Sequence, residues 1–247
     1  MKLSLHKIGV LLKKESKDLL RNSTVAVLII MPIAMTFLFK FMFESSTDGI
    51  EEASHFVGVF VLSFATSMAI AVIPGSVLPT TIAEEKEKKT LRTLMLADVN
   101  GVEFLISKAL IVFLLLLFTL IVIFFITGVS LSVLPMYLLT CIIASISILL
   151  IGSLIGLMSK NQMTSGVISA PIMMILMLMP MMQQFDPILA KIAFFVPTTS
   201  VGNVLEIVLS GSYDWGAILP NYAVMFGWII VSIILFLVMF KKLEKDN

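Results

Sequence analysis

Residues 105–127 of the chain read LISKALIVFLLLLFTLIVIFFIT, a run in which Lys108 is the only charged side chain. A helix needs about 20 consecutive apolar residues to cross the hydrocarbon core of a bilayer. The stretch therefore predicts a membrane-spanning helix. Five further apolar runs have the same character, so the predicted spans are residues 23–43, 56–82, 105–127, 135–158, 164–184 and 217–240.

The composition of the whole chain agrees with six spans. Of its 247 residues, 59% are hydrophobic and 13% are charged, and the mean hydropathy is +1.08. A soluble domain is about 45–50% apolar and about 25% charged. The single cysteine, Cys141, excludes a disulfide scaffold, and a net charge of +1 gives no field that attracts nucleic acid. We expect an all-α polytopic membrane protein with six transmembrane helices and one transmembrane domain, residues 1–247.

The basic residues indicate which way the chain crosses the membrane. All 17 except Lys40 and Lys191 lie before span one, between spans two and three or at the start of span three, between spans four and five, or after span six. Lysine and arginine are enriched in cytoplasmic loops, so both termini are expected to be cytoplasmic. Lys40 is close enough to the outer end of span one for its side chain to reach the lipid headgroups.

Residues 1–22 form a basic segment ahead of the first span. Leu5, Ile8, Leu12 and Leu19 share one stripe of a helix, and the basic side chains fall mostly opposite. This pattern predicts an amphipathic interfacial helix lying on the membrane surface. The alternative is an ordinary basic flank before a span. The basic residues opposite the stripe are Lys7, Lys14, Lys17 and Arg21.

The chain lacks the residues that several classes of membrane protein require. Apart from Lys40 and Lys108 near span ends, the predicted spans contain no charged side chain. This argues against an ion-coupled transporter and an intramembrane enzyme. No glycine precedes a lysine, so there is no G-x-x-x-x-G-K-[ST] phosphate loop. We expect no catalytic residue, metal site or bound cofactor in this chain, and any energy for transport must come from another one.

Small side chains recur every four residues on spans two and five. This spacing lets helices approach closely, and methionines adapt to varied apolar contacts. The sequence thus offers a candidate translocation path or dimer face, and the alternative is packing within the subunit. The candidate residues are Ser63, Ser67, Ala71 and Gly75 on span two, and Ser165, Ser169, Met173 and Met177 on span five.

The segment after span two carries the strongest pattern. Residues 81–108 read TIAEEKEKKTLRTLMLADVNGVEFLISK. Glu84 with Lys88, and Glu85 with Lys89, are i,i+4 pairs in the order that stabilises a helix by about 0.2–0.5 kcal/mol each. We expect a charged helix that continues span two into the cytoplasm, followed by a turn at residues 100–101. It suits docking into a partner's groove, and the alternative is a solvated connector.

The order of residues in this segment resembles the ATP-binding-cassette type-2 permease family, which often reads E-K-E-x-x-T-L-x-x-L-x-x-x-P-V here. This chain departs from the pattern at residues 97–99, where a proline often stands, and at Lys89, where glycine is frequent. The resemblance implies a coupling segment at residues 84–103 that contacts a separate ATPase. The implied contact residues are Glu84, Glu85, Glu87, Lys88, Thr90, Leu91 and Leu94.

The resemblance also implies the partners. A cytosolic ATP-binding-cassette ATPase, in two copies, would bind the ATP and magnesium. A second copy of this chain or a related permease would complete the complex in the lipid bilayer of the plasma membrane.

Residues 185–216, between spans five and six, predict two short helices on the outer face, 186–196 and 198–209, separated by Pro197. The hydroxyl of Thr198 or Thr199 is available as the N-cap of the second. The pair is similar to the external re-entrant hairpin of the permease family. The rival interpretation is an extra span over 188–209, which Pro197, Lys191 and Glu206 oppose.

The leading hypothesis is therefore the transmembrane subunit of an ATP-driven exporter. Spans free of charge and rich in methionine favour a hydrophobic or amphipathic cargo such as a drug, an antimicrobial peptide or a lipid-like molecule. The alternatives are a sodium-exporting permease and a non-transporting immunity or sensor protein that recruits a cytosolic partner through residues 86–92.

Overall fold

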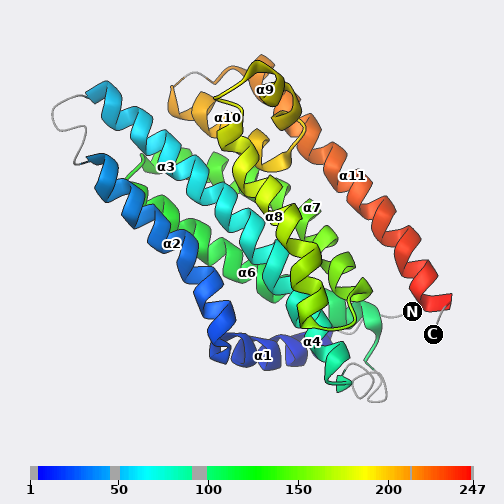
Figure 1. Ribbon diagram of the computed structural model, residues 1–247. Coiled ribbons are helices and arrows are strands. Elements are labelled where there is room, and N and C mark those ends of the chain that lie inside the picture. The colour runs from blue at the N-terminus through cyan, green and yellow to red at the C-terminus, as the bar shows by residue number, and fades with distance from the viewer. Residues whose placement is uncertain (1–4, 45–50, 91–98, 212, 246–247) are drawn as a thin grey trace.

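The computed structural model describes residues 5–44, 51–90, 99–211 and 213–245, and the regular structure in these ranges is helical (Figure 1). The helices are α1 (Leu5–Arg21), α2 (Ser23–Glu44), α3 (Glu51–Val72), the π-helix η1 (Ile73–Val77), α4 (Leu78–Glu87), α6 (Gly101–Thr127), the 3₁₀ turn η2 (Leu131–Val133), α7 (Leu134–Met158), α8 (Gln162–Met182), α9 (Pro187–Ala193), α10 (Pro197–Leu209) and α11 (Trp215–Lys245).

The six predicted spans are confirmed. The helices long and apolar enough to cross a membrane cover Ser23–Phe43, Val57–Glu87, Gly101–Thr127, Leu131–Met158, Gln162–Met182 and Trp215–Met239. The second differs most from its predicted bounds, because it continues past residue 82 to Glu87. The acidic and basic residues 84–87 are therefore the last turn of the same helical rod.

Span two is built from three pieces, α3, η1 and α4. Pro74 lies in the π-helical turn and Pro79 in the first turn of α4. A proline has no N–H to donate and its ring displaces the preceding turn, and a π turn is one way in which a helix absorbs such a disturbance. Span two thus contains a built-in irregularity halfway along its length.

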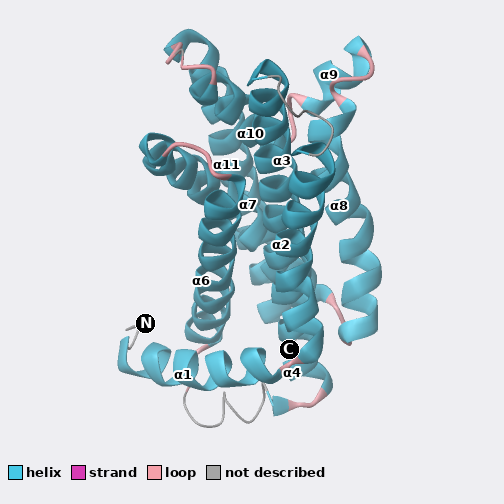
Figure 2. Cartoon of the chain, turned by 90° about the vertical axis from the view of Figure 1, so that its left-hand side faces the viewer, coloured by secondary structure: helices cyan, strands magenta, loops and turns pink. Residues whose placement is uncertain are grey.

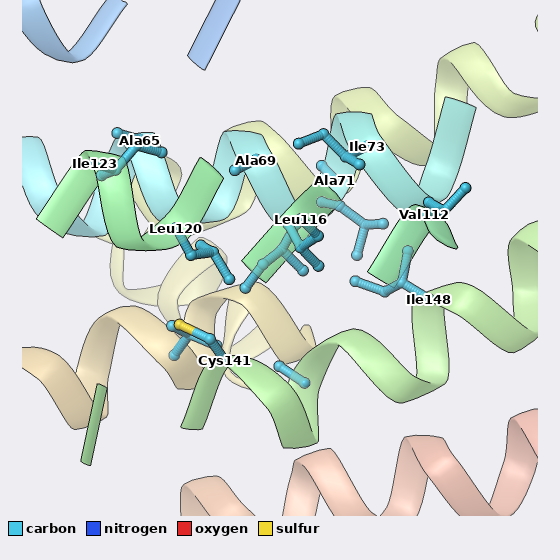
Figure 3. Packing of buried hydrophobic residues seen from close by; sticks show 14 of the residues in the cluster. Ala65, Ala69, Ala71, Ile73, Val112, Leu116, Leu120, Ile123, Cys141 and Ile148 are labelled. Atoms are coloured by element: carbon cyan, nitrogen blue, oxygen red, sulfur yellow. The ribbon is translucent and has the colours of Figure 1, made fainter. Parts of the chain in front are cut away.

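Span two is also the most buried span of the bundle. Figure 3 shows Ala65, Ala69 and Ile73 of span two close to Leu116 and Leu120 of α6. The alanines allow these two helices to approach closely, and Cys141 and Ile148 of α7 belong to the same cluster. Spans two, three and four therefore form the middle of the core, to which α10 and α11 also contribute buried side chains.

Two glycines of α7 fit directly against span two. A Cβ atom on Gly152 would overlap the carbonyl oxygen of Pro74, and one on Gly156 would lie 2.7 Å from Cβ of Ile82. Neither position has room for a side chain without backbone movement. This pair of glycines packs within the subunit.

Helix α1 lies across one end of the bundle and packs against α6 (Figure 2). Of the helix predicted within residues 1–22, the described part is helical over Leu5–Arg21, and its position on a membrane surface stays a prediction. Its inward face buries Ile8, Leu11 and Leu19, and it also buries Glu15, which is only 3% exposed. A carboxylate among apolar side chains requires a partner.

Helices α9 and α10 lie together at the end opposite α1 (Figure 1), and their axes are bent by 104°. Asp186 caps α9 by accepting hydrogen bonds from the backbone N–H groups of Ile188 and Leu189. The predicted N-cap at Thr198 or Thr199 is wrong, because α10 begins one residue earlier at Pro197. Thr198 Oγ1 donates instead to the carbonyl of Leu176 on α8, at 2.5 Å.

Candidate functional site

The last turn of α4 contacts most of the elements around it. A helix rotates by about 100° per residue, so the four consecutive side chains of residues 84–87 point in four directions. Each makes a different contact. Together they join α4 to α1, α6, α7 and α8, and we call residues 84–87 the α4 hub.

Glu85 connects the hub to α1 and α6. Its Oε1 atom lies 3.4 Å from Lys14 Nζ on α1 and 3.5 Å from Lys108 Nζ on α6. The hydroxyl of Thr90 also donates to its carboxylate. One carboxylate therefore joins two helices that are far apart in the sequence.

Lys108 in turn holds the buried carboxylate of α1. Its Nζ atom lies 2.7 Å from Glu15 Oε2, and both side chains are 3% exposed. The ammonium group also lies 5.3 Å from the centre of the Phe104 ring. Desolvating two charges is costly, and removing one partner of such a pair costs about 3–5 kcal/mol. The pair therefore fixes the position of α1 on α6.

A cavity of about 460 Å³ lies beside these ion pairs. Its wall combines basic side chains of α1 and α6 with acidic side chains of α1 and α4, so neither sign dominates. Such a surface favours a partner with charges of both signs. The charged lining residues are Lys14, Glu15, Asp18, Arg21, Glu84, Glu85, Lys88 and Lys108.

Lys86 binds the end of α7. Its ammonium group donates to the carbonyl of Leu157 and, at 2.7 Å, to that of Ser159. The last carbonyls of a helix have no partner within the helix and carry the negative end of its dipole. A lysine at this place therefore stabilises the end of α7 by hydrogen bonding and by charge.

Glu87 binds the start of α8. Its Oε2 atom accepts a hydrogen bond of 3.1 Å from the backbone N–H of Gln162, and Asn161 caps the same helix by accepting from the N–H of Thr164 at 2.8 Å. The first N–H groups of a helix carry the positive end of its dipole. Lys86 and Glu87 thus bind the two ends of the α7–α8 link, each with a charge opposite to that of the helix end it contacts.

Of the two predicted i,i+4 pairs, one is present. Lys88 Nζ lies 2.5 Å from Glu84 Oε1, and this hydrogen bond raises the pKa of Lys88 above its usual value. The pair of Glu85 with Lys89 is wrong. The helix ends at Glu87, Lys89 adopts a left-handed backbone conformation with φ of 58°, and Glu85 binds Lys14 and Lys108 instead.

The remaining predicted contact residues follow the end of α4 in the sequence. Thr90 is part of the hub's network through Glu85, to whose carbonyl its hydroxyl also donates at 3.1 Å. Leu91 and Leu94 lie outside the described residues. The predicted turn at residues 100–101 is the start of α6. Asn100 is the N-cap, and Glu103 accepts a hydrogen bond from its backbone N–H at 3.0 Å.

The small residues of spans two and five belong to neighbouring helices, because α3 and α8 pack together. A Cβ on Gly75 would lie 3.2 Å from Cγ of Met173. Ser67 donates to the carbonyl of Ser63 at 2.8 Å. Ala71 is buried, and Met177 packs at the edge of the core. Ser165 and Ser169 are buried, and their hydroxyls have no hydrogen-bond partner among the described residues. Their role in transport or dimerisation stays a prediction.

Glu15 was not among the residues predicted from the sequence to be functional, and Lys108 was predicted only as a cation near the end of a span. A signal for Glu15 is present, because it lies four residues from both Leu11 and Leu19 and so shares their helical face. An acidic residue on an apolar stripe needs a partner. Nothing in the sequence says that the partner lies 93 residues away.

Six helices of membrane-spanning length make the chain a multi-pass membrane protein. Over residues 45–238 its sequence matches the family described as ABC-2 family transporter protein, and the chain belongs to this family. The family supplies membrane components of ABC transporters, which are not themselves catalytic and typically work with an ATPase subunit. The resemblance drawn from residues 84–108 is thereby confirmed. A comparison with curated proteins found no match.

Proposed function

We propose that this chain is the transmembrane subunit of an ATP-driven exporter and that a separate cytosolic ATPase acts on it at the α4 hub. The observation that carries the proposal is the set of contacts made by residues 84–87. One turn of helix reaches α1, α6, α7 and α8. A displacement of this turn would therefore be transmitted to four other elements at once.

The distribution of charge supports a cytoplasmic position for this end. Fifteen of the 17 basic residues lie before span one, between spans two and three or at the start of span three, between spans four and five, or after span six. Helix α1, the α4 hub and the α7–α8 link belong to these segments, and basic residues favour the cytoplasmic side. Both termini are then cytoplasmic, and the bent pair α9–α10 lies on the outer side as a re-entrant hairpin. The plasma membrane is the expected location.

The coupling mechanism is an equilibrium between two arrangements of the bundle. Two ATPase subunits that bind ATP and magnesium would close and move α4. The ion pairs Glu85–Lys108 and Lys108–Glu15 would carry the movement to α6 and α1, while Lys86 and Glu87 carry it to the α7–α8 link. Such a ligand shifts the equilibrium only by its difference in affinity for the two states. A second copy of this chain, or a related permease, would form the other half of the path.

A hydrophobic or amphipathic cargo best fits the side chains on the faces of spans two and five. The faces of spans two and five carry small and methionine side chains, which adapt to varied apolar shapes, and the described spans offer no cluster of acidic residues for a bare ion. The expected cargo is a drug, an antimicrobial peptide or a lipid-like molecule.

The test is to express the chain with the ATPase encoded nearest to it and to purify the pair. We expect a complex whose ATP-driven export falls strongly in the double variant E84Q/E87Q, because Glu84 loses its ion pair with Lys88 and Glu87 loses its charged contact with the start of α8. The control is D186N at the opposite end, which retains the N-cap oxygen. Export unaffected by E84Q/E87Q, or no complex at all, would contradict the proposal. Resistance that persists with an ATPase unable to hydrolyse ATP would favour a non-transporting immunity protein.

A further inference from the structure

A second cavity lies at the end of the bundle opposite the α4 hub, between α3, α8 and α10. Its volume is about 240 Å³, smaller than the roughly 300–1,000 Å³ of pockets for drug-sized ligands. Phe60, Phe64 and Met181 form an apolar side, and Gln184 and Glu206 contribute polar groups. The cavity therefore suits a small ligand with one apolar and one polar end.

The apolar side is a fixed aromatic wall. The rings of Phe60 and Phe64 are nearly parallel, with an interplanar angle of 12° and centroids 6.2 Å apart. Phe43 meets Phe60 edge-on at 5.8 Å, and Phe39 meets Phe64 edge-on at 5.2 Å. These neighbours hold the two rings in place. The rings therefore offer a surface against which the aromatic end of a ligand can pack.

The polar side carries the negative charge of Glu206. Glu206 is exposed, and its carboxylate makes no hydrogen bond or ion pair within the described part of the chain. The described residues that line the cavity include no basic side chain. Ser63 Oγ also lies at the cavity, buried and without a hydrogen-bond partner among the described residues. Charge complementarity therefore favours a cation.

We propose that this cavity binds a small amphipathic monocation of the aryl-ammonium class. The ammonium group binds at Glu206, and the apolar end lies against the rings of Phe60 and Phe64. A role for this site on the cargo path rests on the proposed export function. With that role, the site restricts the cargo to cations with one apolar end. Binding itself requires only this chain.

The test measures binding to the full-length chain in nanodiscs of phosphatidylcholine, a lipid without net charge. The probe is benzyltrimethylammonium, and its neutral isostere neopentylbenzene, with carbon in place of the ammonium nitrogen, is the matched ligand. Equilibrium dialysis against protein-free nanodiscs corrects for partitioning into lipid. We expect the cation to bind and the isostere, at equal free concentration, not to displace it.

The variant E206Q keeps the size of the side chain and removes its charge, and we expect it to weaken binding about tenfold or more. The matched control is D186N, which removes one acidic charge from the same end without touching the cavity, and we expect less than a twofold change. F60L retains an apolar side chain but loses the ring against which the aryl end packs, and we expect about a twofold to tenfold loss. Thermal unfolding of each variant verifies that it is folded.

Equal binding of the neutral isostere would overturn the proposal, as would E206Q binding as tightly as D186N. The two proposals fail separately. A chain that forms no complex with the ATPase but binds the cation through Glu206 refutes only the export function. A complex that exports cargo while E206Q leaves cation binding unchanged refutes only this site.

Discussion

Lys108 Nζ on α6 lies 2.7 Å from Glu15 Oε2 on α1, and each side chain is 3% exposed. The two residues belong to helices of different orientation, since α1 runs across the end of the bundle and α6 runs along it (Figure 2). Burial removes both charges from water, so each depends on the other for stabilisation. The ion pair therefore converts an amphipathic helix into a fixed part of the bundle, next to the α4 hub.

Removing one member of this pair should destabilise the chain. We expect E15Q to cost about 3–5 kcal/mol, because Lys108 stays buried and, among the described residues, keeps only Glu85, at 3.5 Å, as an acidic partner. The double variant E15L/K108M replaces both charges by apolar side chains and should recover most of the loss. Thermal unfolding of the three proteins in the same detergent measures the differences. A double variant as unstable as E15Q would contradict the explanation.

Lys86 should stabilise the link between α7 and α8. We expect K86M to lower the stability by about 1–3 kcal/mol, because two carbonyls at the end of α7 lose their donor. Protease cleavage at residues 159–161 should become faster. The matched control is K88M on the same turn. Its pair with Glu84 is at the surface, so we expect little change, and equal effects of the two substitutions would argue against a special role for Lys86.

Lys89 is a lysine in a backbone conformation that favours glycine. Its φ of 58° is left-handed, which costs a residue with a side chain about 1 kcal/mol relative to glycine. We therefore expect K89G to raise the stability by up to about 1 kcal/mol, measured by thermal unfolding. The control is K88G. Lys88 has a right-handed backbone with φ of −78°, so glycine relieves no strain there and we expect no gain in stability. A loss of stability in K89G would contradict the prediction.

Gly156 should tolerate no side chain. A Cβ there would lie 2.7 Å from Ile82 Cβ and 3.0 Å from the backbone of Pro79, so we expect G156A to cost about 1–3 kcal/mol. Gly166 on α8 has no atom within 4 Å of a built Cβ. G166A should therefore be neutral or stabilising by up to about 1 kcal/mol, because alanine favours a helix. Thermal unfolding compares the two, and a G156A variant as stable as the parent chain would refute the packing argument.

The sequence by itself determined the six spans. A run of about 20 apolar residues is a local property, and so is the break beside Pro197, which the pattern placed between two short helices and the structure places just before Pro197. The order of residues from Glu84 to Lys108 also pointed to the transporter family to which the chain belongs. Helix ends were less certain. Pro197 occupies the first position of α10 because its φ already suits a helix, and this moved the cap away from Thr198.

Only the tertiary structure decided which charges meet. The spacing of Glu85 and Lys89 predicted a pair, but α4 stops at Glu87, and a helical spacing has no meaning beyond the end of the helix. Glu15 and Lys108 are 93 residues apart in the sequence, and no local sequence pattern predicts that they meet. Apolar burial fixes where α1, α4 and α6 pack, and the charges carried into that junction must then find partners there, because an unpaired buried charge is too costly.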